Sequence, residues 1–145
     1  RLAIERFVNR NVFFAVNGDQ IADLKLRDLA DFHVKNAPVA TIATANPRCP
    51  YGQVHVNDNY EIVEFMEKPL CQHTRCNAGI YVFNREILDY LPERGDVEKV
   101  TFPALAKLGK LSAYPFNGFF VTVNTPKDLV EVEMELRRNL SCVSS

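Results

Sequence analysis

The sequence predicts a single α/β domain over residues 1–145, with a mixed β-sheet and helices packed against it. Short apolar runs alternate with segments whose apolar residues recur every three or four positions, which are the patterns of strands and helices. The first apolar run ends abruptly in the polar turn Asn17-Gly18-Asp19, as buried strands of open α/β sheets do. With 47% hydrophobic residues, the chain can bury about 70% of its unfolded surface in one core.

Composition argues against several functional classes. The net charge is −1 at pH 7 and no basic run occurs, so nucleic acid is not expected as a partner. No apolar stretch reaches the ~20 residues of a membrane span, and residues 1–11 are unlike a signal peptide. We therefore expect no membrane partner. The chain begins without Met, in the pattern of a helix interior, which predicts a trimmed or partial chain.

Four cysteines are too few for a disulfide scaffold at this length, so reduced thiols and a cytoplasmic location are expected. Cys71, His73 and Cys76 fall within six residues, and Cys49 is a further thiol. Zinc sites usually space their cysteines by two to four residues and need a fourth ligand. A loop with incidental thiols is therefore favoured over a metal site.

Periodicity places the elements of the N-terminal half. Residues 2–8 have the pattern of the end of an amphipathic helix, residues 12–16 form a strand, and residues 25–36 form a helix. The short apolar run over residues 38–43 is the next strand. This β-α-β order predicts a parallel pair of strands joined by a right-handed crossover.

The pattern changes after this crossover. Val54 and Val56 alternate with polar residues, Asn57-Asp58-Asn59 supplies a turn, and an extended run follows from Tyr60. These features predict a hairpin with one solvated face. The elements expected beyond it are a strand over 77–83, a short helix over 85–91 and a helix over 97–108 that Pro103 kinks.

The C-terminal region is predicted to hold a second hairpin and a final helix. Asn117-Gly118 is a strong hairpin signal, and apolar runs over 111–116 and 119–123 flank it. Thr125 and Pro126 are residue types typical of a helix N-terminus. The final helix is expected to bury a stripe formed by Leu129, Val132, Leu136 and Leu140.

Asp19 is the first candidate for chemistry, because it follows a strand at the edge where open α/β sheets bind ligands and metals. The alternative is a turn residue that caps the following helix, since Asn-Gly-Asp is common in turns. Spacing alone leaves both interpretations open.

Glu67 and Lys68 form the second candidate. Val63, Phe65 and Glu67 share one face of a predicted strand, so the carboxylate ends an apolar row. Pro69 biases Lys68 toward an extended backbone. An ammonium beside a carboxylate suits a phosphorylated, hydroxyl-rich ligand, and the alternative is an ordinary ion pair at a solvated strand end.

Two segments of small residues could admit a ligand. Asn77-Ala78-Gly79 opens an apolar strand and lets either a ligand or a neighbouring backbone approach closely. Tyr51-Gly52 is either a plain turn or a place where a sugar ring lies against bare backbone.

Taken in order, five segments resemble the sugar-1-phosphate nucleotidyltransferases, a family that includes glucose-1-phosphate thymidylyltransferases and mannose-1-phosphate guanylyltransferases. The segments are Val-Asn-Gly-Asp (16–19), Tyr-Gly-Gln-Val (51–54), Phe-Met-Glu-Lys-Pro (65–69), Asn-Ala-Gly-Ile-Tyr-Val-Phe (77–83) and Asn-Thr-Pro-Lys-Asp-Leu (124–129). The resemblance runs from Arg1 to about Leu140, and Glu-Lys-Pro followed by Asn-Ala-Gly-Ile-Tyr at this distance is a specific combination.

The resemblance implies a Rossmann-like nucleotide-diphospho-sugar transferase fold. The implied reaction joins a nucleoside triphosphate and a sugar 1-phosphate, giving a nucleotide sugar and pyrophosphate. By resemblance, the catalytic residues are Asp19, which would hold Mg²⁺, and Lys68, which would meet the sugar phosphate. The implied substrate-binding residues are Tyr51, Gly52, Glu67, Lys68, Asn77, Ala78 and Gly79.

Two departures from the family pattern bear on activity. The family's glycine-rich phosphate-binding loop has no counterpart, so the N-terminal nucleotide-binding β-α-β units are expected to be lacking. Thr122 stands where members usually carry the second metal-binding aspartate, and Asn124 replaces the usual glycine. Asp19 would then hold Mg²⁺ weakly, because Mg²⁺ prefers carboxylates completed by phosphate oxygens and water.

Two functions are therefore considered. The first is the sugar-phosphate-binding part of a nucleotidyltransferase, with a sugar 1-phosphate and a nucleotide as ligands and little activity alone. The second is a non-catalytic scaffold or regulatory module that keeps the fold. In both cases the strand over 12–16 is expected to expose an edge and apolar surface, which predicts self-association.

Overall fold

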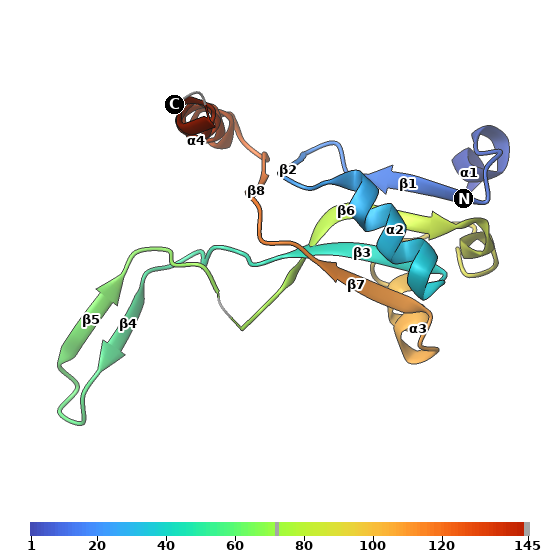
Figure 1. Ribbon diagram of the computed structural model, residues 1–145. Coiled ribbons are helices and arrows are strands. Elements are labelled where there is room, and N and C mark those ends of the chain that lie inside the picture. The colour runs from blue at the N-terminus through green and yellow to red at the C-terminus, as the bar shows by residue number, and fades with distance from the viewer. Residues whose placement is uncertain (72, 144–145) are drawn as a thin grey trace.

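The computed structural model describes residues 1–71 and 73–143, and its centre is a four-stranded mixed sheet (Figure 1). The order is β1 (Val12–Val16), β6 (Cys76–Asn84), β3 (Ala40–Ala45) and β7 (Leu111–Pro115). Strand β6 runs antiparallel to both β1 and β3, and β3 runs parallel to β7. The predicted α/β class with a mixed sheet is confirmed.

The predicted neighbouring parallel pair is wrong in one respect. Strands β1 and β3 run in the same direction, but β6 lies between them and pairs with both. Residues 78–83 of β6 are all buried, because both faces of this strand are covered. The most apolar strand therefore occupies the interior of the sheet and displaces the local β-α-β pairing.

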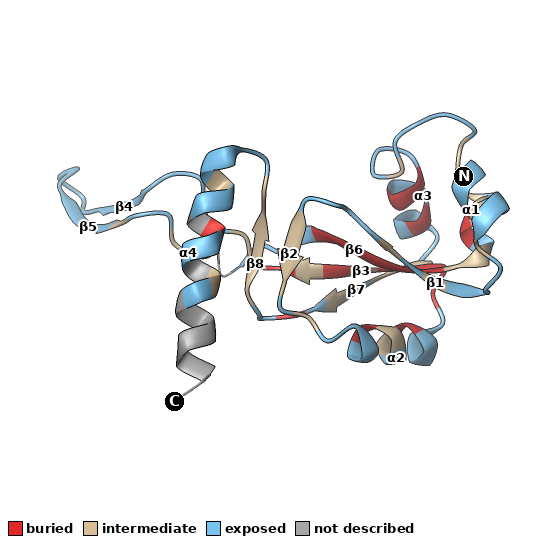
Figure 2. Cartoon of the chain, turned by 90° about the horizontal axis from the view of Figure 1, so that it is seen from above, coloured by how far each residue is buried: buried red, intermediate tan, exposed pale blue. Residues whose placement is uncertain are grey.

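Helices cover both faces of this sheet. Helix α2 (Leu26–Asn36) lies on one face, and α3 (Thr101–Lys107) lies on the other, with α1 (Leu2–Phe7) at the same end (Figure 2). The 3₁₀ helix η1 (Arg85–Asp89) follows β6 directly. One core cluster contains Leu29, Ala43, Ala45, Ala78, Ile80, Val82 and Phe116. The other contains Val39, Ala40, Tyr81, Phe83, Ile87, Phe102 and Leu105.

Pro103 does not kink a helix, contrary to the sequence prediction. Helix α3 begins only at Thr101, so Pro103 is its third residue. Backbone N–H groups in the first turn have no partner within the helix, and a proline there removes no hydrogen bond.

The second hairpin predicted around Asn117-Gly118 is also wrong. Strand β7 pairs with β3, whereas β8 (Phe120–Thr122) pairs antiparallel with β2 (Gln20–Ala22). The segment between them crosses from one sheet to the other. The Arg75 guanidinium holds this crossing by donating to the backbone oxygens of Thr44 and Phe116 and to Asn117 Oδ1, at 3.1, 3.2 and 3.1 Å. These long-range partners override a local turn signal.

The hairpin of β4 (Gln53–Val56) and β5 (Ile62–Met66), here called the arm, is confirmed and extends away from the four-stranded sheet (Figure 1). One solvated face was predicted, but β4 and nearly all of β5 are exposed on both faces. Phe65, for example, is 62% exposed. The apolar row of β5 therefore has no core beneath it.

Helix α4 (Pro126–Val143) begins as predicted. Thr125 Oγ1 accepts from the N–H of Asp128 at 3.2 Å, and Asp128 Oδ2 accepts from the N–H groups of Asn124 and Thr125 at 3.0 and 2.8 Å. These donors lower the pKa of the Asp128 carboxyl. Of the predicted buried stripe, Val132 is buried, Leu136 is partly buried and Leu129 is 57% exposed. The side chain of Leu140 lies outside the described part of the chain.

None of the helices in the described residues is both long and apolar enough to cross a bilayer.

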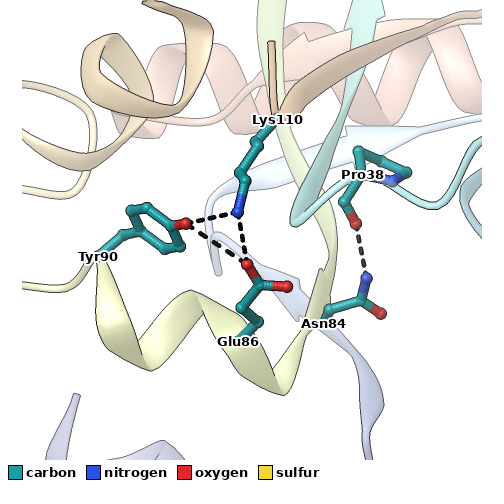
Figure 3. Close-up of polar contacts among 5 residues, drawn as sticks. All are labelled: Pro38, Asn84, Glu86, Tyr90 and Lys110. Atoms are coloured by element: carbon teal, nitrogen blue, oxygen red, sulfur yellow. Dashed lines mark hydrogen bonds and ion pairs between the residues drawn. The ribbon is translucent and has the colours of Figure 1, made fainter. Parts of the chain in front are cut away.

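A buried histidine joins α2 to the sheet. The amide of Asn84 donates to Pro38 O at 2.6 Å (Figure 3), which leaves Asn84 Oδ1 to accept from His33 Nε2 at 3.2 Å. His33 Nδ1 then accepts from the Thr41 hydroxyl at 2.8 Å. Burial lowers the pKa of His33, and the hydrogen bond to Asn84 partly offsets this decrease.

A second polar network lies beside the first. Lys110 Nζ donates to Glu86 and Tyr90 at 2.8 and 2.7 Å and ties η1 to the start of β7 (Figure 3).

The free energy of unfolding is expected to fall as the pH is lowered below about 6.5, the ordinary pKa of histidine. In the window between that value and the lower pKa of folded His33, the unfolded chain binds a proton that the native chain does not. Urea titrations at several pH values measure the slope. The variant His33→Gln is less stable overall but should show a flatter profile in this window. Equal slopes in the two proteins would assign the effect to other groups.

Candidate functional site

Three strands bring distant segments together at the C-terminal end of β1. The N–H of Asn17 donates to Gly79 O at 2.8 Å, and the N–H of Val123 donates to Asp19 O at 2.8 Å. Gln20 lies opposite Thr122 in the β2–β8 pair. We call this group the junction site; it contains the sequence-predicted residues Asp19, Gly79 and Thr122, with Asn77 two residues before Gly79. Ala78, also predicted to bind substrate, is fully buried in the core.

Gly79 makes the close approach at the junction site possible. Its φ is +67°, in the left-handed region that favours glycine. A Cβ atom on Gly79 would lie 2.7 Å from Gln20 Cγ and 2.9 Å from Asn17 Nδ2. Of the two alternatives that the sequence left open, the structure shows a neighbouring segment close to Gly79, and that neighbour is the segment around Asp19.

A hydrogen-bond chain links Asp19 to Thr122. The Thr122 hydroxyl donates to Gln20 Oε1 at 2.8 Å, and Gln20 Nε2 donates to Asp19 Oδ1 at 3.1 Å. Asp19 is exposed, in the turn between β1 and β2, whereas Gln20 and Thr122 are partly buried. Sequence reasoning missed Gln20, because a single amide after a turn carries no periodic or motif signal.

Asn77 sits in a second network. Its Oδ1 accepts from the N–H of Gly79 at 2.8 Å, and its Nδ2 donates to Tyr81 Oη and Glu98 Oε1 at 2.8 and 2.9 Å. The Tyr81 hydroxyl also donates to Glu98 Oε1, at 3.1 Å. Burial raises the pKa of the Tyr81 hydroxyl, so it stays protonated as a donor. Tyr81 and Glu98 were not predicted, because Glu98 reaches Asn77 from 21 residues away.

The remaining predicted residues lie at the base of the arm, and we call Tyr51, Gly52, Glu67 and Lys68 the arm site. A Cβ atom on Gly52 would lie 2.7 Å from Phe65 Cζ and 3.0 Å from Glu67 Oε2, so bare backbone at Gly52 leaves room for the carboxylate. Tyr51 is 79% exposed beside them. The backbone of Gly52 and the carboxylate of Glu67 are therefore neighbours on the surface of the arm base.

Lys68 departs from the sequence prediction. Pro69 was expected to hold it extended, but its φ is +44°, in the left-handed region. The chain must turn sharply after β5 so that the N–H of Cys49 can donate to Pro69 O at 2.8 Å and Arg48 can pair with Leu70. A lysine held in this conformation is strained, and such strain gathers at functional sites.

The structure pairs Cys49 and Cys71 as a disulfide, with Cα atoms 6.0 Å apart. The expectation that all thiols are reduced is therefore wrong for this pair. The antiparallel base of the arm brings the two residues together, and local spacing does not reveal a partner 22 residues away. Pairing with Cys49 also removes the Cys71 thiol from the segment shared with His73 and Cys76.

The two sites are separate in this structure. No hydrogen bond or ion pair within residues 1–71 and 73–143 joins Glu67 or Lys68 to the junction site. A cavity of about 550 Å³ lies between the arm base and β8, a size typical of small-molecule sites. Its lining includes Arg48 and Leu70 from the arm base and Thr122, Asp128 and Val132 from β8 and α4.

The side chains around Asp19 do not fit a Mg²⁺ site by themselves. Mg²⁺ needs oxygen ligands in near-octahedral geometry, usually with one or two carboxylates. Here one carboxylate oxygen of Asp19 already accepts from Gln20, and the hydroxyl of Thr122 is directed at Gln20. No group of three or more His, Cys, Asp or Glu side chains in the described ranges could hold a metal ion.

The fold and the ordered motifs are those of the nucleotidyl transferase family. The profile of the family described as "Nucleotidyl transferase" matches residues 2–139, and the chain belongs to this family. Within it, the chain is 38% identical over 123 residues to the "Mannose-1-phosphate guanyltransferase" of Yarrowia lipolytica (strain CLIB 122 / E 150), a match that covers 81% of this chain and 34% of that protein. Identity to the "Mannose-1-phosphate guanylyltransferase catalytic subunit beta" of Dictyostelium discoideum is 37% with the same coverage. The chain spans about a third of the length of these curated relatives.

Solved structures show the same Rossmann-like fold. HddC from Yersinia pseudotuberculosis superposes with a TM-score of 0.60 at 18% identity, over 90% of this chain and 57% of that one. A putative glucose-1-phosphate thymidylyltransferase from Bacillus anthracis, in complex with a sucrose, superposes with a TM-score of 0.61 at 20% identity, over 88% of this chain and 55% of that one. At these identities the likeness shows the fold alone.

Proposed function

We propose that this chain forms the sugar-1-phosphate-binding part of a nucleotidyltransferase that makes a nucleotide sugar and pyrophosphate. The observation that carries the proposal is the arm site, where Glu67 lies against Gly52 and the adjacent Lys68 is held in a left-handed conformation. The names of the curated relatives support mannose 1-phosphate and a guanine nucleotide as the first ligands to test.

The chemistry of the arm site suits a sugar phosphate. The carboxylate of Glu67 accepts hydrogen bonds from sugar hydroxyls, and the ammonium of Lys68 neutralises charge on the phosphate. The exposed ring of Tyr51 offers an apolar face to the sugar. In the complete reaction, an oxygen of the sugar phosphate attacks the α-phosphorus of the triphosphate in line, and pyrophosphate leaves. Residues that hold the attacking phosphate accelerate this step by positioning it and by neutralising charge.

The junction site has a supporting role in the proposal. Gly79 packs against the segment around Asp19, and hydrogen bonds to Gly79, Tyr81 and Glu98 fix the amide of Asn77 two residues away. Asp19 is the proposed catalytic carboxylate at the strand end. Because its surroundings do not fit Mg²⁺ without further ligands, no step of the proposal depends on a metal bound by this chain.

Glu67→Ala is expected to weaken mannose 1-phosphate binding by roughly tenfold or more, since a hydrogen bond to a charged group contributes about 1.5–3 kcal/mol. Isothermal titration calorimetry measures the dissociation constant. Glu64→Ala is the matched control, because Glu64 is a nearby glutamate in β5 that faces away from the side on which Phe65 and Glu67 approach Gly52. An equal loss in both variants would contradict a specific role of Glu67. In a pyrophosphate-release assay we expect little turnover from this chain, and robust turnover would contradict that expectation.

The alternative function is a non-catalytic scaffold that kept the fold. Thr122 at the position of the family's second carboxylate favours it. Absence of any binding heat from wild type and Glu67→Ala, with mannose 1-phosphate and other sugar 1-phosphates, would favour the scaffold.

We further infer self-association through β1. This strand is at the edge of the four-stranded sheet, and Val12, Phe14 and Val16 on one of its faces are 39, 42 and 56% exposed. An exposed edge strand with apolar side chains readily pairs with another chain. Light scattering should therefore detect dimers or larger species, and Phe14→Lys should reduce them. A monomer at high concentration would contradict this inference.

A further inference from the structure

We propose that the Cys49–Cys71 disulfide is a reversible latch that holds the base of the arm and orders the arm site. Formation of the disulfide closes the latch, and reduction to two thiols opens it. The predicted consequence for sugar-phosphate affinity rests on the proposed function, whereas the ordering of the arm does not.

The two cysteines lie where the arm leaves the body of the protein. Their Cα atoms are 6.0 Å apart, within the range that disulfides span without movement of the backbone. The N–H of Cys49 donates to Pro69 O at 2.8 Å, and the N–H of Cys71 donates to Pro47 O at 2.9 Å. The cross-link therefore reinforces a short antiparallel ladder that brings both ends of the arm together.

The arm depends on this base for its order. An isolated two-stranded hairpin is marginally stable in water, and β4 and β5 are exposed on both faces. A covalent link between the ends removes many open conformations of the enclosed chain. Without the link, non-covalent contacts such as the hydrogen bonds of Cys49 N and Cys71 N must oppose fraying.

The arm site lies entirely inside the closed segment. Gly52 is three residues after Cys49, and Lys68 is three residues before Cys71. The left-handed conformation of Lys68 persists only where the surrounding structure imposes it. Opening the base therefore lets Lys68 relax and move away from its place beside Glu67.

Exposure decides which sulfur reacts. Cys49 is 8% exposed and Cys71 is partly exposed, so an external thiolate reaches Cys71. It attacks Cys71 Sγ, the S–S bond breaks, and Cys49 leaves as a thiolate that accepts from Gln53 Nε2, which lies 3.0 Å from Cys49 Sγ. A second glutathione thiolate then attacks the glutathione sulfur of the mixed disulfide and releases the Cys71 thiolate. The two protein sulfurs gain two electrons, and the reductant becomes a disulfide. Oxidised glutathione closes the latch by the reverse exchange and yields two glutathione thiols.

Cys76 is the third thiol near this region and provides a matched control. It is unpaired and partly buried in the structure. Burial raises the pKa of the Cys76 thiol, so less of the reactive thiolate is present than at an exposed cysteine. It is therefore not expected to compete for the latch.

The test equilibrates the full chain in buffers of defined reduced and oxidised glutathione. Alkylation followed by peptide mass spectrometry should show the Cys49–Cys71 link forming and disappearing with the glutathione ratio. Limited proteolysis within the arm should be roughly an order of magnitude slower in the oxidised protein. Cys76→Ser should respond as the wild type does, whereas Cys49→Ser should be cleaved quickly at every ratio. Absence of the link at all ratios, or equal cleavage rates, would overturn the proposal.

Calorimetry with mannose 1-phosphate separates the latch from the proposed function. Tighter binding to the oxidised protein supports both. Equal affinity in the two redox states overturns the effect of the latch on the arm site. No binding in either state, with the arm still protected by oxidation, contradicts the proposed function and supports the latch.

Discussion

Replacing Gly79 by alanine is expected to lower the free energy of unfolding by about 2–5 kcal/mol. The left-handed backbone at φ +67° costs an alanine about 1–2 kcal/mol. The new Cβ would also lie 2.7 Å from Gln20 Cγ and 2.9 Å from Asn17 Nδ2, and overpacking of this kind costs about 1–3 kcal/mol. Urea denaturation followed by circular dichroism measures the loss.

Gly109→Ala is the matched control for this prediction. Gly109 has the same φ of +67°, but a Cβ atom there meets nothing within 4 Å. Its substitution should therefore show the backbone cost alone, about 1–2 kcal/mol. If both variants lose the same stability, the close packing between Gly79 and the segment of Asp19 contributes nothing, and the junction site is looser than described.

Thr122→Asp is expected to create divalent-cation binding that the wild-type chain lacks or shows only weakly. The substitution places a second carboxylate opposite Gln20, whose side chain bridges position 122 and Asp19 in the wild type. Two carboxylates repel each other without a cation and attract one when it is present. Mn²⁺ affinity, measured by calorimetry or electron paramagnetic resonance, should rise by roughly tenfold or more, equivalent to about 1.4 kcal/mol.

Thr122→Asn separates charge from shape. Asparagine has nearly the same size as aspartate but carries no charge, so its Mn²⁺ affinity should stay close to that of the wild type. The unfolding temperature of Thr122→Asp should also rise with added Mn²⁺, because a cation that binds only the folded state stabilises it. Equal Mn²⁺ affinities in the two variants would show that position 122 does not face a cation site.

Local patterns predicted most of the elements. The apolar runs that became β1, β3 and β6, the periodic segment of α2 and the cap of α4 at Thr125 all lie close to their expected bounds. Each of these depends on neighbours within a few residues, so the sequence carries the signal directly. The α/β class follows from their alternation.

The errors arise where distant segments decide the outcome. The place of β6 between β1 and β3, and the pairing of β8 with β2, depend on which apolar surfaces are best covered in the finished fold. The disulfide at Cys49 and the left-handed backbone of Lys68 follow from the antiparallel base of the arm. The periodicity of apolar residues reports local structure and does not indicate which distant segments pair.

The sequence indicated which residues belong to the candidate site, but it did not predict their positions relative to one another or their contacts. Motif order indicated Asp19, Glu67, Lys68 and Gly79, and at Gly79 the structure shows a neighbouring segment in close contact. Gln20 and Glu98 were missed, because each acts through a partner that only the fold brings near. Whether Glu67 and Lys68 bind a sugar phosphate stays a prediction for the calorimetric test.

The bond between Gln20 and Thr122 has a consequence for the time course of folding. These residues are 102 positions apart, so their contact closes a very large loop. Loop-closure entropy makes such contacts form after the local ones, and chains rich in them fold slowly. During synthesis, β2 must also wait until β8 has emerged from the ribosome. The surroundings of Asp19 are therefore expected to be among the last parts of the protein to acquire their native structure.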